Sequence, residues 1–514
     1  MKLISTFIGL QTGKNIAILN QKDAEELGAS EGGRIKIEAK NKSIVAIVNI
    51  SKTLKKGKII LSEEIKKFAR IKENEEVTVE LATQPEAVKA IKAKLDGKEL
   101  SYEEFFSIVK SAVNNELSEI ELTSFVVGLH ERGLSFEEAA MLSNAMVNVG
   151  ERLELNKKRI FDKHSIGGVP GDKTTMLVVP IVASAGLMIP KTSSRAITSA
   201  AGTADRVEVI MPVNLSIEEM KEVVEKTNGC MVWGGALHLS PADDIFIQIE
   251  KPLGIDPLLF PSILSKKKAV GATDLVIDIP VGESVKIGNV EEGFRLSQKF
   301  IKLGKLLGIK IKTALTSGIQ PIGSTIGPAL EAKEALEVIE GKKNSLDLID
   351  KATSIAGILL EMAGKARNGE GKELAKKLLR TKAEKKLREI IEAQGGDPRI
   401  KSEDIKIGDK SFDYFAEKSG MILWFDNYDL AQIARIAGAP KDKGAGILLY
   451  KKLGDNVKAG EKLLTIFAER STKLQEAEEY TKEADFVRIG SYNEVLYKKV
   501  EEVSKKREKF MIVR

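Results

Sequence analysis

Two short stretches of this chain combine glycines, hydroxyl groups and cations in a way that suits the binding of anions. The first covers residues 163–175 and reads KHSIGGVPGDKTT, and the second covers residues 191–206 and reads KTSSRAITSAAGTADR. Glycine allows backbone N–H groups to approach an oxyanion closely, hydroxyls donate further hydrogen bonds, and Lys and Arg supply positive charge near a helix N-terminus. We therefore expect two anion sites close together in one strand-and-helix unit.

The first loop differs from the P-loop of nucleotide-binding enzymes. A P-loop has Gly directly before Lys and Ser or Thr, whereas Asp172 separates Gly171 from Lys173 in this chain. A single glycine-rich turn of this kind usually carries only a solvated lysine. Two such loops within residues 163–206, both rich in hydroxyls and cations, favour a binding function.

Three other residues could take part in chemistry, although each has an ordinary structural role open to it. Asp256 could be a general acid, because a carboxyl in an apolar pocket has a raised pKa, but Asp before Pro is also a common turn residue. Lys286 follows an apolar run whose end would face ligands in an open α/β sheet, but it could be a surface lysine. A lone histidine such as His164 contributes to packing more often than to catalysis.

Both loops resemble the phosphate-binding signatures of the thymidine and pyrimidine nucleoside phosphorylases, KHSxGGVGDK and SGR followed by GGTxDKxE. The chain departs from them at three positions, because Pro170 is inserted, Ser194 replaces Gly, and Ala201 replaces the first Gly of GGT. These departures and an additional N-terminal segment resemble the archaeal AMP phosphorylase branch of the family. The resemblance covers about residues 86–490. It implies phosphorolysis of a nucleoside 5′-monophosphate to the free base and ribose 1,5-bisphosphate, in AMP degradation and nucleotide salvage.

The resemblance also implies roles for single residues. Asp256 would be the catalytic proton donor to the leaving purine. The residues implied to bind the attacking phosphate are Lys163, Ser165, Ser193 and Thr203, whereas His164 is implied to lie at the sugar and base and Lys266 at the base. The residues implied to bind the nucleotide, including its 5′-phosphate, are Gly168, Ser194, Arg195, Ala196, Ile197, Thr198, Ser199, Thr203, Ser262 and Lys286.

The base-recognition residues only partly match the pyrimidine enzymes. Ser262 and Lys266 match the Ser and Lys that hold the base there, but the Arg of those enzymes would align near Ile247. Pyrimidine-specific recognition is therefore not implied, and we expect AMP as the substrate, with CMP and UMP as further substrates. Inorganic phosphate is the expected co-substrate, and no metal or organic cofactor is expected.

Three alternatives stay open at this point. A thymidine or pyrimidine nucleoside phosphorylase would cleave nucleosides instead of nucleotides. A phosphoribosyltransferase of related architecture would need pyrophosphate and usually magnesium. A protein that chiefly binds or assembles would depend on its N-terminal part, so deletion of residues 1–84 would test that hypothesis.

The composition is that of an ordinary soluble protein of several domains. The chain has 514 residues, of which 43% are hydrophobic and 30% charged. A net charge of +6, spread over 80 basic and 74 acidic residues, does not indicate a nucleic-acid partner. No apolar run approaches the roughly 20 residues of a membrane span, and no signal peptide is recognised. Cys230 is the single cysteine, so an internal disulfide is excluded. We expect a cytoplasmic enzyme of small molecules that does not bind membranes.

Hydrophobic periodicity and turn residues divide the chain into parts of different type, which together predict an α/β multidomain protein. Capping boxes that begin at Ser101, Ser118 and Ser135 predict successive helices, and the apolar run 273–281 predicts a buried parallel strand. The resemblance implies a homodimer formed through the helical domain, or a larger homo-oligomer. The expected parts are a small N-terminal β-barrel (1–84), a helical domain (85–155, to which 242–266 return), a central α/β domain with a mostly parallel sheet that binds phosphate and nucleotide (156–410), and a C-terminal α+β module resembling a barrel-sandwich (411–514).

Overall fold

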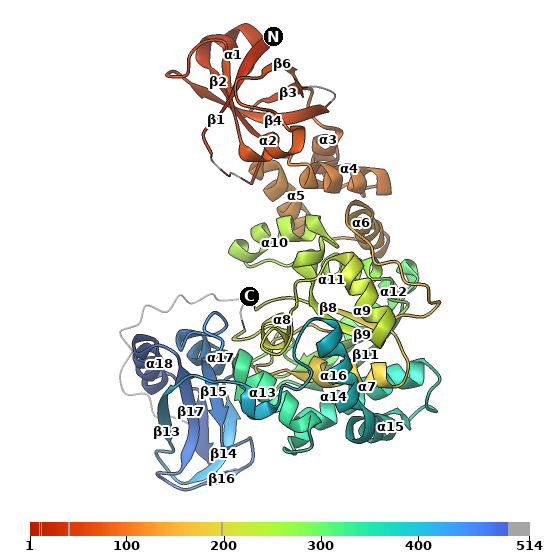
Figure 1. Cartoon of the computed structure of the whole chain (residues 1–514), viewed down its shortest axis with the longest axis vertical. Coiled ribbons are helices and arrows are strands. Elements are labelled where there is room, and N and C mark those ends of the chain that lie inside the picture. Colours follow the sequence, from red (N-terminus) through yellow and green to blue (C-terminus); the bar gives the residue numbers. More distant parts are fainter. Residues whose placement is uncertain (10, 12, 40–41, 197–198, 492–514) are drawn as a thin grey trace.

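The computed structural model describes residues 1–9, 11, 13–39, 42–196 and 199–491, and it shows an elongated molecule with a β-barrel at one end (Figure 1). A helical bundle follows the barrel, an α/β domain lies beyond the bundle, and a C-terminal module packs beside the α/β domain. This arrangement confirms the predicted fold class. Within the described ranges, every helix is too short or too polar to cross a membrane.

The N-terminal barrel is closed, with the strand order β1-β5-β2-β4-β3-β6. Alternate side chains of each strand point inward, so that Ile35 and Ile37 of one strand pack against Ala46 and Val48 of another. The sequence predicted a small β-barrel here, but it did not predict the two short helices between its strands. The barrel elements are β1 Lys2–Phe7, β2 Ile16–Asn20, α1 Gln21–Leu27, β3 Arg34–Ala39, β4 Lys42–Ser51, β5 Lys58–Leu61, α2 Glu63–Ala69 and β6 Glu76–Leu81.

The helical bundle begins after Pro85, and all three predicted capping boxes form. In each box the Ser hydroxyl accepts a hydrogen bond from the backbone N–H of the Glu three residues later. The carboxylate of that Glu accepts a hydrogen bond from the backbone N–H of the Ser. Phe246 from a later segment packs against Phe125 with ring centroids 5.5 Å apart, so that segment shares the core of the bundle. The helices are α3 Glu86–Leu95, α4 Tyr102–Val113, α5 Glu119–Arg132, α6 Phe136–Val149, α10 Pro241–Leu253 and α11 Leu259–Ala269.

The α/β domain contains two parallel sheets, β11-β10-β7 and β8-β9, which meet where Phe161 N donates to Met188 O at 2.8 Å. The apolar helix α7 and helix α14 form the core of this domain. Its strands are β7 Phe161–Ser165, β8 Ile189–Ser193, β9 Gly229–Trp233, β10 Asp274–Val281, β11 Lys310–Ser317 and β12 Thr325–Ile326. Its α-helices are α7 Thr174–Ser184, α8 Thr203–Val207, α9 Ile217–Thr227, α12 Val290–Leu307, α13 Pro328–Ile339, α14 Leu346–Met362, α15 Gly371–Leu378 and α16 Glu384–Ala393.

The C-terminal module has two antiparallel sheets, β12-β15-β17-β13 and β16-β14-β18. Strand β12 belongs to the preceding part of the chain, so the first of these sheets joins the module to the α/β domain. Helix α17 is a further element that the sequence did not predict. The module comprises β13 Lys410–Phe415, β14 Gly420–Phe425, α17 Asn427–Ile436, β15 Gly446–Leu449, β16 Asn456–Val457, β17 Lys462–Ala468, α18 Ser471–Glu483 and β18 Val487–Gly490.

Candidate active site

The first loop leaves the carboxyl end of β7 and enters helix α7, where ligands bind in open parallel sheets. Gly168 has a φ of 98°, and a Cβ atom there would lie 3.3 Å from the backbone N of Lys286. A glycine is therefore favoured at this position, because its conformation is left-handed and the space is narrow. The contact also brings two of the predicted site residues together from segments far apart in the chain.

Lys163, in the middle of β7, is buried without an ion pair to any carboxylate of the described residues. The neighbouring Lys351 pairs instead with Asp172 at 2.9 Å and with Asp278 at 3.0 Å. Burial lowers the pKa of Lys163, although the carboxylates of Asp172 and Asp278 oppose this effect. The ammonium group of Lys163 is thus held by the fold and left without a direct counter-ion, which suits the binding of a phosphate.

His164 lies in strongly positive surroundings. Burial lowers its pKa well below the ordinary value, and the nearby cations Lys267, Lys191 and Lys266 lower it further. Lys267 pairs with the buried Asp162 at 2.6 Å, and Lys266 pairs with Asp243 at 2.6 Å. The sequence did not single out Lys191 or Lys267, although Lys191 opens the second loop and Lys267 follows Lys266 directly.

We expect the His164 imidazole to stay neutral across the range around pH 6.5 in which an unperturbed histidine titrates, because protonation would add a cation to this cluster. The chain has three histidines, so imidazole resonances followed by NMR from pH 5.5 to 8 can be assigned with His164→Gln as reference. A His164 midpoint within that range would contradict the expectation.

The second loop folds back on itself around the carboxylate of Asp205. Asp205 accepts hydrogen bonds from Ala196 N at 2.7 Å and from Gly202 N at 2.9 Å. A Cβ atom on Gly202 would lie 2.4 Å from the carbonyl carbon of Arg195, so only glycine fits. Ser194 is exposed, and its carbonyl accepts from Ala204 N at 3.2 Å.

The remaining predicted residues of this loop differ in their surroundings. Ser193 ends β8 and donates to Val232 O at 3.3 Å, Thr203 begins α8, and Ser199 donates to Ala201 O at 3.2 Å. Ile197 and Thr198 lie outside the described residues.

Arg195, predicted as an anion ligand, is bound to carboxylates in this structure. Its guanidinium donates to Glu208 at 2.8 and 2.6 Å and to Asp205 at 3.2 Å, and it stacks over Trp233 at 4.9 Å from the ring centroid. These hydrogen bonds, with a contribution from Lys443, lower the pKa of Glu208 to about 2. Glu208 thus stays ionised at neutral pH beside the predicted 5′-phosphate loop.

Arg206, which the sequence analysis did not single out, ties the two loops together. Its buried guanidinium donates to the carbonyl of Asp172 in the first loop and to Ala201 O in the second at 2.7 Å. It also pairs with Glu331 at 3.0 Å. Because one rigid planar group spans both loops, the two candidate anion sites have a fixed spacing.

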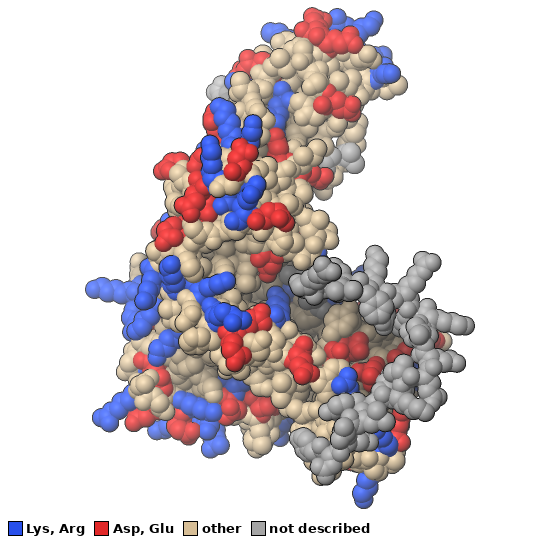
Figure 2. Space-filling model, turned by 180° about the vertical axis from the view of Figure 1, so that it is seen from behind, with Lys and Arg blue, Asp and Glu red and all other residues tan. Residues whose placement is uncertain are grey.

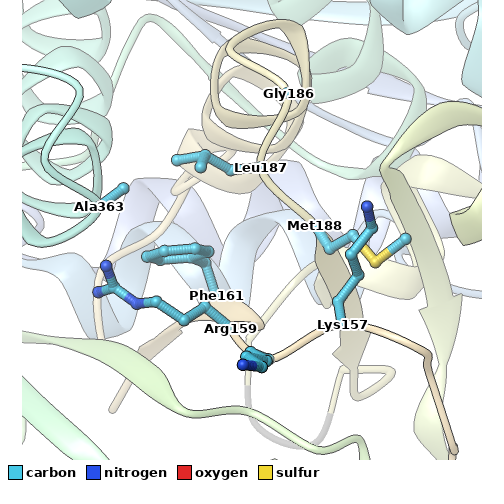
Figure 3. A pocket seen from close by; sticks show the side chains of 8 residues that line it. Lys157, Arg159, Phe161, Gly186, Leu187, Met188 and Ala363 are labelled. Carbon is cyan, nitrogen blue, oxygen red and sulfur yellow. The ribbon is translucent and has the colours of Figure 1, made fainter.

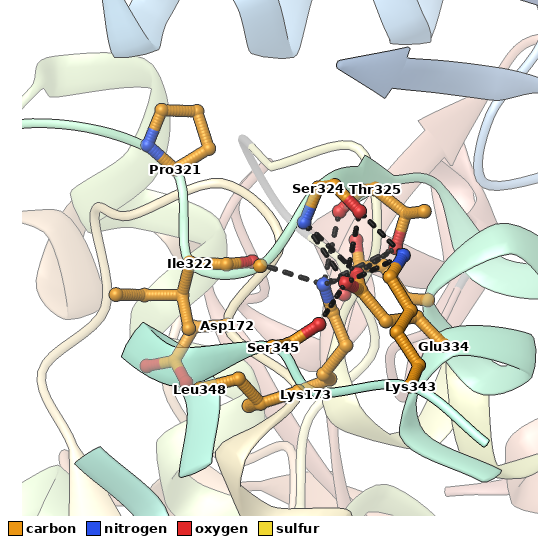
Figure 4. Close-up of polar contacts among 12 residues, drawn as sticks. Asp172, Lys173, Pro321, Ile322, Ser324, Thr325, Glu334, Lys343, Ser345 and Leu348 are labelled. Atoms are coloured by element: carbon orange, nitrogen blue, oxygen red, sulfur yellow. Dashed lines mark hydrogen bonds and ion pairs between the residues drawn. The ribbon is translucent and has the colours of Figure 1, made fainter. Parts of the chain in front are cut away.

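A second buried cation, Lys173 of the first loop, binds this loop to the segment that contains Ile322 and Thr325 and to α13. Lys173 donates to Glu334 at 2.7 Å and to the carbonyls of Ile322 at 2.9 Å and Thr325 at 3.2 Å (Figure 4). Both charged side chains are 0% exposed, and Glu334 is also bound by Ser345 Oγ at 2.6 Å. The lysine of the loop is therefore part of the scaffold and does not face a ligand.

The opposite side of the candidate site comes from α10 and α11. Asp256 lies in the segment between α10 and α11. The residue is exposed, but desolvation of its carboxyl by the surrounding protein raises its pKa, while Lys286 lowers it. The two predicted residues are therefore close enough to interact electrostatically. Glu250, which the sequence did not indicate, is buried near Asp256, and burial raises its pKa to about 7. Ser262 is half-buried on α11.

Two cavities lie elsewhere. One of about 250 Å³ is lined by Arg159, Phe161 and Met188 at the amino end of β7 (Figure 3), opposite to the end at which parallel sheets bind ligands. Another, of about 970 Å³, lies between the ends of β10 and β11 and the C-terminal residues Trp424 and Arg488. Neither is lined by a predicted site residue. Seen from behind, the surface is also hollowed between the helical bundle and the α/β domain (Figure 2).

Family models match successive parts of the chain. The helical bundle domain of a glycosyl transferase family matches residues 88–150, and the a/b domain of such a family matches residues 157–383. The C-terminal domain of pyrimidine nucleoside phosphorylases matches residues 422–485. The N-terminal domain of cell division protein 48 matches residues 9–84.

Curated relatives match nearly the whole chain. The AMP phosphorylase of Thermofilum pendens is 48% identical over 491 residues, which are 95% of each chain. The AMP phosphorylase of Thermococcus sibiricus is 50% identical over 480 residues, 93% of this chain and 95% of the relative. That of Thermococcus kodakarensis is 48% identical over 492 residues, 95% of this chain and 98% of the relative.

Among solved structures, anthranilate phosphoribosyltransferase from Thermus thermophilus covers 59% of this chain and 99% of its own, with a TM-score of 0.51. At 19% sequence identity this likeness shows a shared fold alone.

Proposed function

This chain belongs to the AMP phosphorylase family, and we propose that it catalyses the phosphorolysis of AMP to adenine and ribose 1,5-bisphosphate, with CMP and UMP as further substrates. The observation that carries this proposal is the pair of anion loops held at a fixed spacing by Arg206. One loop offers Lys163 to the attacking phosphate, and the other offers Arg195 to the 5′-phosphate. A nucleoside would need only the first of these sites.

In the proposed reaction, an oxygen of inorganic phosphate attacks C1′ of the ribose while the bond from C1′ to the base nitrogen breaks. The electron pair of that bond passes to the base, which takes a proton from the Asp256 carboxyl. The raised pKa of Asp256 supports this role, because the acid keeps its proton to higher pH. Lys163 offsets the charge of the attacking phosphate and holds it in line with C1′.

We propose that inorganic phosphate is the only co-substrate and that no metal or organic cofactor takes part. The chain itself supports this proposal, since Lys163 lies without a carboxylate partner among the described residues where the phosphate is expected. We also propose that the chain forms a homodimer through its helical domain or a larger homo-oligomer, which the mass of the assembly in solution would reveal.

The proposal predicts free-base release from AMP that requires phosphate and is unaffected by a chelator. AMP, CMP, UMP and the corresponding nucleosides are compared, with and without phosphate, by chromatography of the released base. Release from nucleosides alone would indicate a pyrimidine nucleoside phosphorylase and would remove the 5′-phosphate role from Arg195. Dependence on pyrophosphate and magnesium would indicate a phosphoribosyltransferase.

A further inference from the structure

Lys443 of the C-terminal module reaches the loop that we assign to the 5′-phosphate. Its Nζ lies 2.8 Å from Glu208 Oε2 and 3.7 Å from Asp205 Oδ1. It lies in the segment between α17 and β15, and its backbone carbonyl accepts from Ala329 N at 3.0 Å, which fixes the segment on α13. Arg195, Asp205, Glu208 and Lys443 together are called the Glu208 cluster below.

The Glu208 cluster contains two carboxylates and two cations, so its formal charge is zero. Asp205 is held by two backbone N–H groups and cannot turn away from the loop. Glu208 is bound by Arg195 on one side and by Lys443 on the other. Without Lys443 the cluster would carry a net negative charge, and a phosphate dianion approaching Arg195 would be repelled.

One donor of the Arg195 guanidinium is not used by the described residues. Its two terminal nitrogens bind Glu208, but no acceptor among the described residues bonds its Nε, so one side of the guanidinium can still donate. The stacking on Trp233 fixes the plane of the group. Glu208 thus orients the guanidinium of Arg195. This orientation helps phosphate binding only if a further cation balances the negative charge of Glu208.

We propose that Lys443 is a specificity-determining residue for the 5′-phosphate of the substrate, because its charge brings the Glu208 cluster to zero net charge and so keeps the two carboxylates from repelling a phosphate that approaches Arg195. This inference rests on the proposed phosphorolysis of nucleoside monophosphates. It assigns to the C-terminal module a part in substrate selection, although we place none of its described residues at the reacting centre.

The test is Lys443→Met, with initial rates measured over a range of AMP and phosphate concentrations. We expect KM for AMP to rise about tenfold, the effect of about 1.4 kcal/mol, while KM for phosphate and kcat change less than about twofold. Lys443→Arg should restore KM for AMP, because it keeps the charge. Lys441→Met, at an exposed lysine of the same segment, is the matched control and should leave KM for AMP unchanged.

A double variant separates charge balance from a purely structural role. In Lys443→Met/Glu208→Gln the extra carboxylate is gone, so the charge of the cluster returns to zero and KM for AMP should fall back toward the original value. An unchanged KM in Lys443→Met, an equal rise of both KM values, or no rescue in the double variant would overturn the inference. If the unaltered protein releases no base from AMP, the proposed function itself fails.

Discussion

Replacing Asp256 with asparagine is expected to lower kcat for AMP phosphorolysis by about 10²- to 10⁴-fold, the contribution of a positioned general acid. Asparagine keeps the shape of the side chain but cannot transfer a proton to the leaving base. KM for AMP and for phosphate should change little, because neither anion site includes Asp256. Steady-state rates at saturating AMP and phosphate give the comparison.

The same variant should also change the dependence of the rate on pH. The acid acts in its protonated form, so kcat of the unaltered enzyme should fall as pH rises through the raised pKa of Asp256. That decline should be absent in Asp256→Asn. AMP methylated at N7 offers a further test, because its base leaves uncharged without a proton, and this substrate should recover most of the lost rate.

Asp244→Asn is the matched control for Asp256→Asn. Asp244 is an exposed carboxyl on α10 with a pKa that burial also raises, yet we assign it no part in proton transfer. Its replacement should lower kcat less than about twofold. A comparable loss in both variants, or full activity of Asp256→Asn, would show that the proton comes from another group, and Glu250 would be the next candidate because its pKa is raised to about 7.

The parts of the fold that the sequence predicted depend on local signals. A capping box needs only Ser101 and Glu104, four positions of one turn, so its helix start can be read directly from the chain. The buried strand predicted over residues 273–281 is found as Asp274–Val281, because a run that is apolar on both faces is typical of a parallel strand covered on both sides. Short helices such as Asn427–Ile436 were missed, since they lie between strands and carry only a brief periodic pattern.

The sequence predicted which types of residue form the candidate site, but it did not predict which of their side chains form ion pairs with one another. The sequence predicted that Arg195 would face an anion and that Gly168 would mark a place where backbone must approach closely, but the tight packing at Gly202 appears only in the structure. It could not show that Glu208 would bind the guanidinium, because a surface Arg and Glu have many possible partners. Nor could it show that Lys443 would reach the loop from a separate module, since nothing in its local sequence specifies that contact.

Replacing Lys173 with methionine is expected to destabilise the α/β domain by about 3–5 kcal/mol, because it leaves Glu334 buried without its main counter-ion. The thermal transition of that domain should fall by roughly 10 °C. Lys343→Met is the matched control, since Lys343 lies 3.0 Å from the same carboxylate but is 33% exposed, and its loss should cost less than about 1 kcal/mol. Calorimetry of both variants measures the difference.

A double variant shows whether the lost stability comes from the unpaired buried carboxylate or from lost packing. Lys173→Met/Glu334→Gln removes the buried charge, so it should recover more than half of the lost stability, whereas a packing defect would remain.

The ion pair of Lys173 and Glu334 also makes the stability depend on pH. Pairing lowers the folded pKa of Glu334, so this stabilisation is present above the ordinary carboxyl pKa and is lost as pH falls through the folded value. The difference in the free energy of unfolding between the unaltered protein and Lys173→Met should therefore become smaller toward acid pH. A difference that stays constant with pH would show that the carboxylate in the variant is already protonated or hydrated. In that case Lys173 would hold the first loop chiefly through the carbonyls of Ile322 and Thr325.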